Sequence, residues 1–255
     1  MSNIFYAPGE QHAAKVNDLF GAIARRYDLL NDLQSFGLHR RWKRQVVRLA
    51  AGKPGDRVLD VCCGTGDLAL AMAERGLDVI GLDFSRAMLE VAKKRRQKKP
   101  GDPNPKFIEG DAHQIPFPDA SFDVITVGYG LRNLTSWETG LAEMNRVAKR
   151  GARLVVLDFG KPANRVWRRF YFAHLRMIVP LLGLIFCSNA RAYAYILESL
   201  KHYPAQNGVA SKMQDLKLTN VRIINLLGGA MAINYGEKPG QPEVQSCAIH
   251  GRLPP

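Results

Sequence analysis

The chain contains the sequence VLDVCCGTGD at residues 58–67 and the sequence VIGLD at residues 79–83. The first is an apolar run that passes through a glycine-containing turn into the amphipathic segment 68–75. A strand, a glycine turn and a helix in this order are typical of nucleotide sites, because glycines let the backbone approach a ligand at the helix N-terminus. We therefore predict that Gly64 and Gly66 bind a nucleotide-like cofactor.

Short apolar runs alternate with amphipathic segments on both sides of this unit. The expected strands are residues 58–61, 79–82, 106–109, 124–127 and 154–157. The expected helices between them are residues 68–75, 87–94 and 137–148. Clusters of Gly, Pro and charged residues at 53–55, 99–103 and 149–151 come directly before expected strands and predict turns. This alternation indicates an α/β fold with a parallel sheet and helices on both faces.

Helical segments flank the central unit. Apolar side chains at helical spacing predict a helical cap over residues 1–50, ahead of a domain that spans residues 51–236. Further helices are expected at residues 164–186, 190–200 and 206–215. The runs 221–226 and 230–235, joined by two glycines, predict a closing antiparallel hairpin at the sheet edge. The tail 237–255 is rich in Pro and Gly and is expected to be loose.

The composition is that of a globular protein that can bury one core, with 255 residues, 46% of them hydrophobic and 23% charged. The formal charge of +13 predicts an anionic partner, which leaves nucleic acid, a membrane surface and an acidic substrate open. The N-terminus lacks a basic region followed by an apolar run, and no apolar run reaches the length of about 18 residues that a membrane span requires. We therefore expect a cytoplasmic protein.

The four cysteines do not have the spacing of metal ligands. Cys62 and Cys63 are adjacent in the glycine turn, and Cys187 and Cys247 lie far from them. We expect reduced structural thiols and no metal site.

Aspartates stand at the ends of three expected strands. Asp60 could balance a cationic ammonium or sulfonium group, whereas it would repel a pyrophosphate. Asp83 follows the loop by about 20 residues, where an acceptor for ribose hydroxyls is expected. Asp111 could accept the amino hydrogen of adenine, with Ala112 leaving room for the ring. An adenosine that carries a cationic group fits this series, and we predict S-adenosylmethionine as the cofactor.

Residues 27–42, YDLLNDLQSFGLHRRW, resemble the N-terminal signature of the C-methyltransferases of ubiquinone and menaquinone biosynthesis. The resemblance extends to residues 58–67, 110–112, 130–133 and 146–151, and it covers roughly residues 14 to 237. It implies a Rossmann-like sheet of seven strands, S-adenosylmethionine as methyl donor, and a polyprenylated hydroquinone as the acceptor that is methylated on a ring carbon. Residues 51–236 are then the methyltransferase domain, with a helical substrate lid at residues 163–215.

The resemblance also implies individual cofactor contacts. By position these fall on Thr65, Asp83, Asp111 and Ala112. Gly128 stands where some members of the family carry a serine at the cofactor, and we include it among the expected contacts. In contrast to a glutamate common in the family, residue 158 is an aspartate.

The expected acceptor chemistry suggests roles for residues after the fourth strand. A hydroquinol ring carbon becomes nucleophilic when the neighbouring hydroxyl loses its proton, so the site needs a base and a group that stabilises the oxyanion. Because the pKa of arginine is above about 12, we expect Arg132 to stabilise the phenolate and Asn133 to orient the hydroxyl. The alternative is that Arg132 pairs with an acid or caps a helix.

The proton could leave through an ordered water or through His39, since imidazole has a pKa of about 6.5. A packing or helix-capping histidine is the alternative. Tyr27 and Asn31, one helical turn apart, are expected to line the substrate pocket, together with Tyr129.

A polyprenylated acceptor would reside in the bilayer. The apolar segment 177–187 is interrupted by a proline and is too short to span a membrane. It is expected either to pack in the core or to form a wall of the tail channel that touches lipid. The preceding Arg165, Arg168, Arg169 and Arg176 suit anionic headgroups. We therefore expect a location peripheral to the inner face of the membrane, no nucleic-acid partner, and consider a homodimer.

The leading prediction is conversion of demethylmenaquinol to menaquinol. Methylation of 2-methoxy-6-polyprenyl-1,4-benzoquinol in ubiquinone synthesis and methylation of a phytyl-naphthoquinol are the closest alternatives. An RNA methyltransferase and a non-catalytic lipid-binding protein are alternatives from other classes. The chain lacks an amino-methylating Asn-Pro-Pro-Tyr motif, and a lipid-binding protein leaves the series of aspartates unexplained.

Overall fold

The structure is a computed structural model that describes residues 11–24, 27–97, 104–187 and 197–240. The side chains of residues 178–187 lie outside this description. So do the turn predicted at residues 99–103, most of the helix predicted at 190–200, and the tail beyond residue 240.

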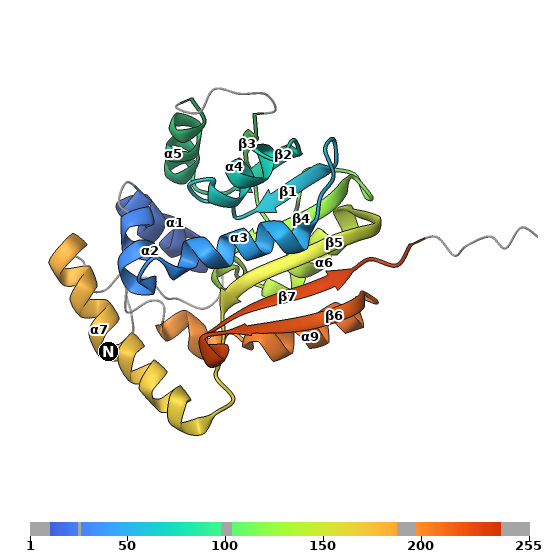
Figure 1. The fold of residues 1–255 in the computed structure, drawn as a ribbon. Helices are drawn as coiled ribbons and strands as arrows, with labels where there is room; N and C mark the ends of the chain where they lie inside the picture. The colour runs from blue at the N-terminus through green and yellow to red at the C-terminus, as the bar shows by residue number, and fades with distance from the viewer. Residues whose placement is uncertain (1–10, 25–26, 98–103, 188–196, 241–255) are drawn as a thin grey trace, which may run out of the picture.

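A seven-stranded mixed sheet runs through the described chain (Figure 1). Its strands are β1 (Arg57–Val61), β2 (Asp78–Asp83), β3 (Lys106–Glu109), β4 (Phe122–Gly128), β5 (Ala148–Phe159), β6 (Thr219–Leu226) and β7 (Met231–Glu237). Their order is β3-β2-β1-β4-β5-β7-β6, parallel from β3 to β5, and β7 is antiparallel to both of its neighbours. The predicted α/β fold with a mostly parallel seven-stranded sheet and a closing hairpin is confirmed.

Each face of the sheet has its own hydrophobic core. Alternate residues of β1 enter different cores, with Val58 on one face and Leu59 on the other. Helices α3 (Leu38–Ala50), α4 (Asp67–Ala73) and α5 (Arg86–Gln97) cover the first face. Helices α6 (Trp137–Val147) and α9 (Ala205–Asp215) cover the second, behind the sheet in Figure 1. The prediction of helices on both faces is therefore confirmed.

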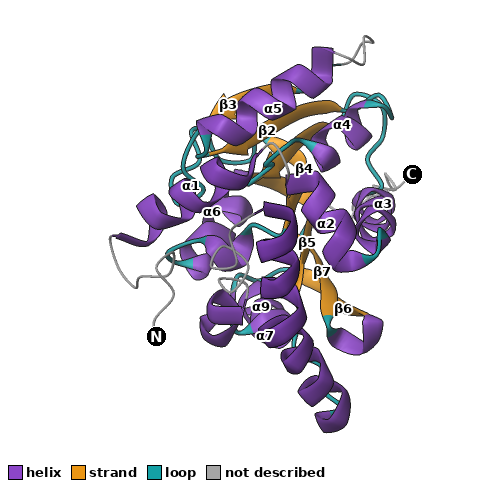
Figure 2. Cartoon of the chain, turned by 90° about the vertical axis from the view of Figure 1, so that its left-hand side faces the viewer, coloured by secondary structure: helices purple, strands orange, loops and turns teal. Residues whose placement is uncertain are grey.

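Three further helices gather at the carboxyl ends of the parallel strands. They are α1 (Gln11–Ile23), α2 (Tyr27–Ser35) and α7 (Arg165–Cys187), and Figure 2 shows them in front of the sheet. Helix α2 packs against α3 and α7. Of the two labelled helices in the segment 163–215, α7 lies at this end, whereas α9 packs on β6 and β7. None of the described helices has the length and apolar character needed to cross a membrane.

The turn predicted at residues 149–151 is wrong, because β5 already begins at Ala148. These residues form an irregularity within the strand, where the pairing register shifts: Phe122 of β4 pairs with Ala148, whereas Val124 pairs with Arg153. Gly151 has φ +76, which an L side chain rarely adopts, and its N–H donates to the carbonyl of Lys238 over 2.9 Å. Glycine therefore marks a bulge within the strand at this position.

Candidate active site

The turn after β1 is held open by backbone geometry that favours glycine. Gly66 has φ +83 at the start of α4, and a Cβ there would lie 2.8 Å from the ring of Phe107. Asp83 fixes the turn from the neighbouring strand: one carboxylate oxygen accepts the N–H of Gly64 at 2.7 Å and the other accepts the N–H of Ser85 at 2.9 Å. The predicted glycine turn is thus a pre-formed concave backbone surface at a helix N-terminus.

Asp60 is a buried acid with spare acceptor capacity. Its Oδ1 accepts the hydroxyl of Thr126 at 2.8 Å, whereas its Oδ2 has no hydrogen-bond partner among the described residues. Burial raises the pKa of Asp60 to about 7. The residue lines a small cavity together with Lys43 and Gly64. An unpaired buried carboxylate oxygen beside this turn fits the ammonium group of S-adenosylmethionine, because a cation there would compensate its charge.

A second small cavity adjoins the first. It is lined by Asp83, Gly64, Gly128 and Tyr129, and the last three also line the cavity of Asp60. The predicted contacts Asp60, Gly64, Asp83 and Gly128 are therefore brought together around one turn. The ribose contact assigned to Asp83 stays a prediction.

The structure does not bring Asp111 and Ala112 to these two cavities. The Asp111 side chain is 65% exposed, and its Oδ1 contacts the backbone N–H and Nδ1 of His113 at 2.8 Å and 2.7 Å. Partial burial opposes the effect of these His113 hydrogen bonds, which hold the pKa of Asp111 below its usual range. The adenine contacts of both residues stay predictions.

A network of charged side chains ties α2 to the glycine turn. The hydroxyl of Thr65 donates to Asp28 at 2.8 Å, and Arg95 donates to Asp28 at 3.0 Å and to the Thr65 carbonyl at 3.0 Å. Arg95 also pairs with Asp67, which Lys43 of α3 contacts at 2.5 Å. Although burial opposes it, the pKa of Asp67 is well below its usual range because of Lys43 and Arg95. These pairings join residues 24 to 67 positions apart, and no local pattern predicts them.

A much larger cavity of about 430 Å³ lies beside the turn, at the end of the sheet where α2 and α7 meet. Its lining is largely apolar and includes Trp42, Phe159 and Phe170. The polar side chains that line it are Tyr27, Asn31, Gln34, Ser35, His39, Tyr129, Arg132, Tyr171 and His174. All three predicted substrate-binding residues are among them, and Tyr27 and Tyr129 also line both small cavities.

Arg132 lies in this large cavity and is paired with an acid. Its Nη1 donates to Asp158 Oδ1 at 2.8 Å and to the carbonyl of Tyr129 at 2.7 Å, and its backbone N–H donates to the other Asp158 oxygen at 3.1 Å. The guanidinium carbon lies 4.6 Å from the ring centre of Phe159. Arg132 therefore pairs with an acid, as the alternative had it, and also lines the cavity. Its role in stabilising a phenolate stays a prediction.

Asn133 does not line the large cavity. It lines the small cavity of Asp83, and its Nδ2 donates to the carbonyl of Tyr129 at 3.0 Å. Residue 129 is held at φ +64, a conformation that bulky residues rarely adopt. Arg132 and Asn133 thus both donate to the Tyr129 carbonyl, yet they line different cavities, with Tyr129 lining both.

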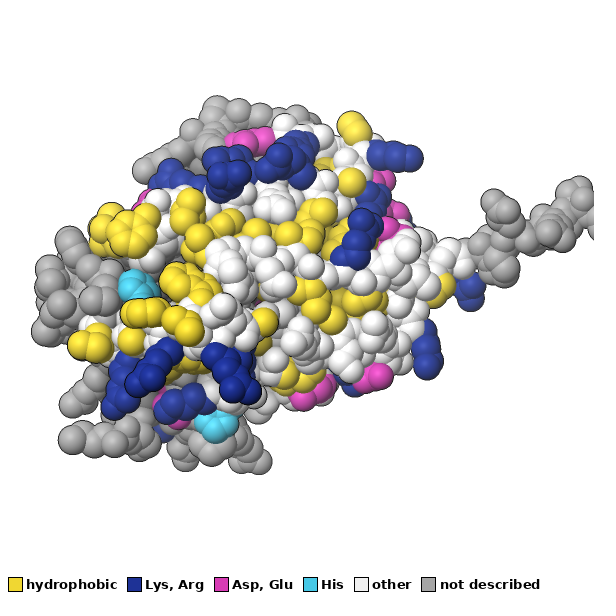
Figure 3. Space-filling view, turned by 60° about the horizontal axis from the view of Figure 1, so that its bottom comes forward, with side chains coloured by type: hydrophobic (Ala, Val, Ile, Leu, Met, Phe, Trp, Pro, Cys, Tyr) yellow, Lys and Arg dark blue, Asp and Glu magenta, His cyan; other side chains and the backbone are white. Residues whose placement is uncertain are grey.

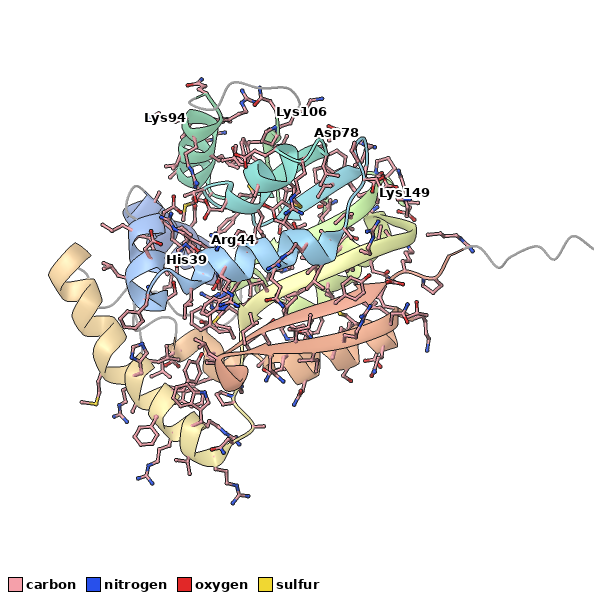
Figure 4. All side chains as sticks on the ribbon, in the orientation of Figure 1. His39, Arg44, Asp78, Lys94, Lys106 and Lys149 are labelled. Carbon is pink, nitrogen blue, oxygen red and sulfur yellow. The ribbon has the colours of Figure 1, made fainter. Side chains whose placement is uncertain are left out.

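His39 is buried at the start of α3, and Figure 4 labels it close to α2. The Ser35 hydroxyl donates to the carbonyl of Asn31 at 2.6 Å, so its single proton is used there. His39 Nδ1, 2.9 Å from the same oxygen, must then be the nitrogen that donates. This leaves Nε2 as an acceptor. Burial first, and then the charge of Lys43, lowers the pKa of His39.

The two cysteines of the turn are free thiols in the structure. Burial and the neighbouring Asp83 raise the pKa of both Cys62 and Cys63, so the thiols are neutral at physiological pH. Among the described residues, no group of three or more His, Cys, Asp or Glu side chains is arranged to hold a metal ion.

Comparison with known proteins agrees with this geometry. The family model described as the ubiE/COQ5 methyltransferase family matches residues 9–238. The chain is 42% identical over 238 residues to the demethylmenaquinone methyltransferase of Desulfitobacterium hafniense (strain Y51), covering 91% of this chain and 92% of that protein. It is 40% identical over 236 residues to the ubiquinone/menaquinone biosynthesis C-methyltransferase UbiE of Azotobacter vinelandii, covering 91% and 93%.

Among solved structures, the fold is similar to that of magnesium protoporphyrin IX methyltransferase (ChlM) from Synechocystis PCC 6803 with bound SAH. The TM-score is 0.64 at 18% identity, over 89% of this chain and 99% of that one. At this identity the likeness shows the fold alone. From the family match and the identity to its members, the chain belongs to the ubiE/COQ5 methyltransferase family and is an S-adenosylmethionine-dependent C-methyltransferase.

Proposed function

We propose that the protein methylates a ring carbon of demethylmenaquinol to give menaquinol. The observation that carries the proposal is the largely apolar cavity of about 430 Å³ that adjoins the glycine turn, with Tyr27 and Tyr129 lining both regions. An apolar cavity with a few buried polar groups suits an aromatic ring that bears two hydroxyls and a prenyl tail.

We assign the cofactor to the two small cavities around the glycine turn. Asp60 would hold its ammonium group and Asp83 its ribose, with Gly64 and Gly128 giving the backbone room. When bound there, S-adenosylmethionine supplies an electrophilic methyl group. Opening of the contact between Thr65 and Asp28 would free the Thr65 hydroxyl for the cofactor. Asp111 and Ala112 remain candidates for the adenine end.

Arg132 would stabilise the phenolate of the acceptor. Its guanidinium is fixed by Asp158 and by the Tyr129 carbonyl, so it costs little reorganisation when negative charge develops on the substrate oxygen. Burial raises the pKa of Tyr27 and Tyr129, so both phenols stay protonated and can donate hydrogen bonds in the same cavity. Asn133 would act from the cofactor side, where it holds residue 129 in place.

His39 would remove the proton of the acceptor hydroxyl. Its Nε2 is the acceptor nitrogen, and the lowered pKa keeps the ring neutral near pH 7. Asn31 and Ser35 support this tautomer through the hydrogen bond between them. The proton moves from the hydroxyl oxygen to Nε2, and the resulting imidazolium lies 3.7 Å from a carboxylate oxygen of Asp32.

The benzoquinol step of ubiquinone synthesis is the second candidate. It is favoured by the name of the Azotobacter vinelandii relative, which covers both pathways. For either acceptor we propose a cytoplasmic enzyme that works at the inner face of the membrane, where a prenylated quinol resides. A homodimer stays a prediction.

Transfer of labelled methyl from S-adenosylmethionine tests the proposal. The purified protein should label a demethylnaphthoquinol, label a methoxy-benzoquinol more slowly, and leave RNA unlabelled. Arg132→Gln should abolish most of the transfer while S-adenosylmethionine binding, followed by calorimetry, is retained. Absence of label in the naphthoquinol would overturn the proposal, and faster labelling of the benzoquinol would favour the second candidate.

A further inference from the structure

Helix α7 carries parallel rows of side chains that differ in where they point. One row lines the large cavity and consists of Trp167, Tyr171 and His174. The adjacent row is shifted by one residue, faces solvent and consists of Val166, Phe170, Ala173 and Met177, of which Phe170 also lines the cavity. Both rows follow the spacing of three and four residues that places side chains on one helical face. The cavity wall and an exposed apolar stripe are thus neighbouring faces of one helix.

The exposed stripe is unusually apolar for a surface. Val166, Phe170 and Met177 are 65%, 66% and 68% exposed. Leu227 and Phe36, which line the cavity, are 50% and 85% exposed and extend the apolar surface around its opening. Several exposed apolar side chains gathered on one helix and around one cavity, unlike single ones, indicate an interaction site.

A basic row flanks the stripe on the side away from the cavity. It consists of Arg165, Arg169 and Arg176, each one residue before a member of the stripe, and all three are exposed. Figure 3 shows hydrophobic side chains gathered on this face next to Lys and Arg side chains. Arginines can lay their stems along an apolar surface and hold the guanidinium in the polar layer beside it.

We infer that the stripe and its basic row, together the α7 docking surface, bind an anionic lipid bilayer. The apolar stripe would enter the boundary between headgroups and acyl chains, and the arginines would contact the phosphates. Because the cavity row adjoins the stripe, a prenyl tail could pass from the bilayer into the cavity along one helix. The inference rests on the proposed function in one respect, namely that the substrate is a membrane lipid.

Binding to vesicles tests the docking surface directly. The full chain is sedimented at low salt with phosphatidylcholine vesicles that contain about one-third phosphatidylglycerol. We compare Val166→Ser/Met177→Ser and Arg165→Gln/Arg169→Gln, none of which lines a cavity, with Lys94→Gln/Lys106→Gln. Figure 4 labels these two control lysines at the opposite end of the molecule from α7. Thermal melting verifies that each variant folds.

The wild type and the lysine control should bind, and both α7 variants should bind about tenfold more weakly. Binding should also weaken at about 0.5 M salt, because part of it is electrostatic. Retained binding in both α7 variants, or no binding of the wild type to anionic vesicles, overturns the inference. Binding of the wild type to vesicles of phosphatidylcholine alone with equal affinity contradicts the role of the arginines.

Activity on two forms of the acceptor separates this inference from the proposed function. The α7 variants should methylate a tail-less quinol in solution at the wild-type rate and lose activity on a prenylated quinol in vesicles. If the wild type leaves the tail-less quinol unmethylated while vesicle binding behaves as expected, the proposed function fails and the docking surface stands. Equal activity of the variants on the prenylated quinol in vesicles contradicts docking as the route of the substrate.

Discussion

Arg132 and Asp158 form an ion pair beneath the large cavity, with Nη1 2.8 Å from Oδ1 and side chains that are only 6% and 4% exposed. The backbone N–H of Arg132 donates to the second carboxylate oxygen. The acid therefore fixes both the backbone and the guanidinium of the residue that we assign to phenolate stabilisation. Two effects should be separable by mutation, the stability of a buried pair and the rate of the reaction.

Arg132→Gln should destabilise the fold by about 3 kcal/mol, because Asp158 is left as an unpaired buried charge. The double variant Arg132→Gln/Asp158→Asn should recover most of this free energy of unfolding, since both charges are removed. In both variants the rate of methyl transfer should be lower than that of the wild type by about 100-fold or more. Denaturant unfolding and methyl-transfer kinetics check the two effects. A double variant with the wild-type rate would remove Arg132 from the mechanism.

The rate should depend on the protonation of His39. Burial lowers the pKa of this ring below its ordinary value of 6.5, helped by Lys43 and Arg40 and opposed by Asp32 and Asp67. The neutral base is present above that lowered pKa, so kcat should decrease as pH falls through it. His39→Gln should reduce kcat by about 100-fold and remove this acidic limb. His202→Gln, at an exposed position, is the control. An unchanged pH profile in His39→Gln would assign the proton to another group.

Asp60→Asn should weaken binding of the cofactor and raise the stability of the fold. The unfolded chain releases the Asp60 proton near pH 3.8 and the folded protein near pH 7, so the free energy of unfolding falls as pH rises between these values. The asparagine variant avoids this loss and keeps an acceptor for Thr126. Its melting temperature should exceed that of the wild type by more at pH 8 than at pH 5. Calorimetry should show at least about tenfold weaker binding of S-adenosylmethionine. Unchanged affinity would move the ammonium site elsewhere.

Arg95→Met should loosen α2 from the glycine turn, because Arg95 contacts both Asp28 and Thr65. The ion pair of Arg95 with Asp28 is about one-third exposed, so its loss should change the melting temperature little. Binding of S-adenosylmethionine should change by several-fold, measured by stopped flow as altered association and dissociation rates. Lys93→Met removes an exposed cation from the same helix and should leave both rates unchanged. Identical kinetics in the two variants would exclude control of the turn by α2.

The sequence was most informative where function depends on local order. The strand, turn and helix around Gly64 and Gly66 could be predicted because backbone conformation there is set by neighbouring residues. The resemblance in residues 27–42 identified the family, which the family match confirms. Gly151 misled the prediction, since a glycine with positive φ occurs both in turns and in bulges, and pairing with β4 and β7 decides between them.

The rest of the site depends on contacts between distant segments. The pairing of Arg132 with Asp158 joins residues 26 positions apart, and that of Thr65 with Asp28 joins residues 37 apart. Such pairs depend on how separate elements pack together, which local sequence patterns do not predict. The departure from glutamate at residue 158 was visible, but its partner was not. The same holds for Asn133, whose side chain lines a different cavity from that of Arg132 although the two residues are adjacent.

The quinone content of cells lacking this chain tests the proposed reaction most directly. Total quinones would be extracted from a deletion strain and from the same strain complemented with the wild type or with Arg132→Gln. Demethylmenaquinone should accumulate in the deletion strain and in the Arg132→Gln strain, and menaquinone should return only with the wild type. Normal menaquinone in the deletion strain, with a different metabolite accumulating, would contradict methylation of demethylmenaquinol by this protein.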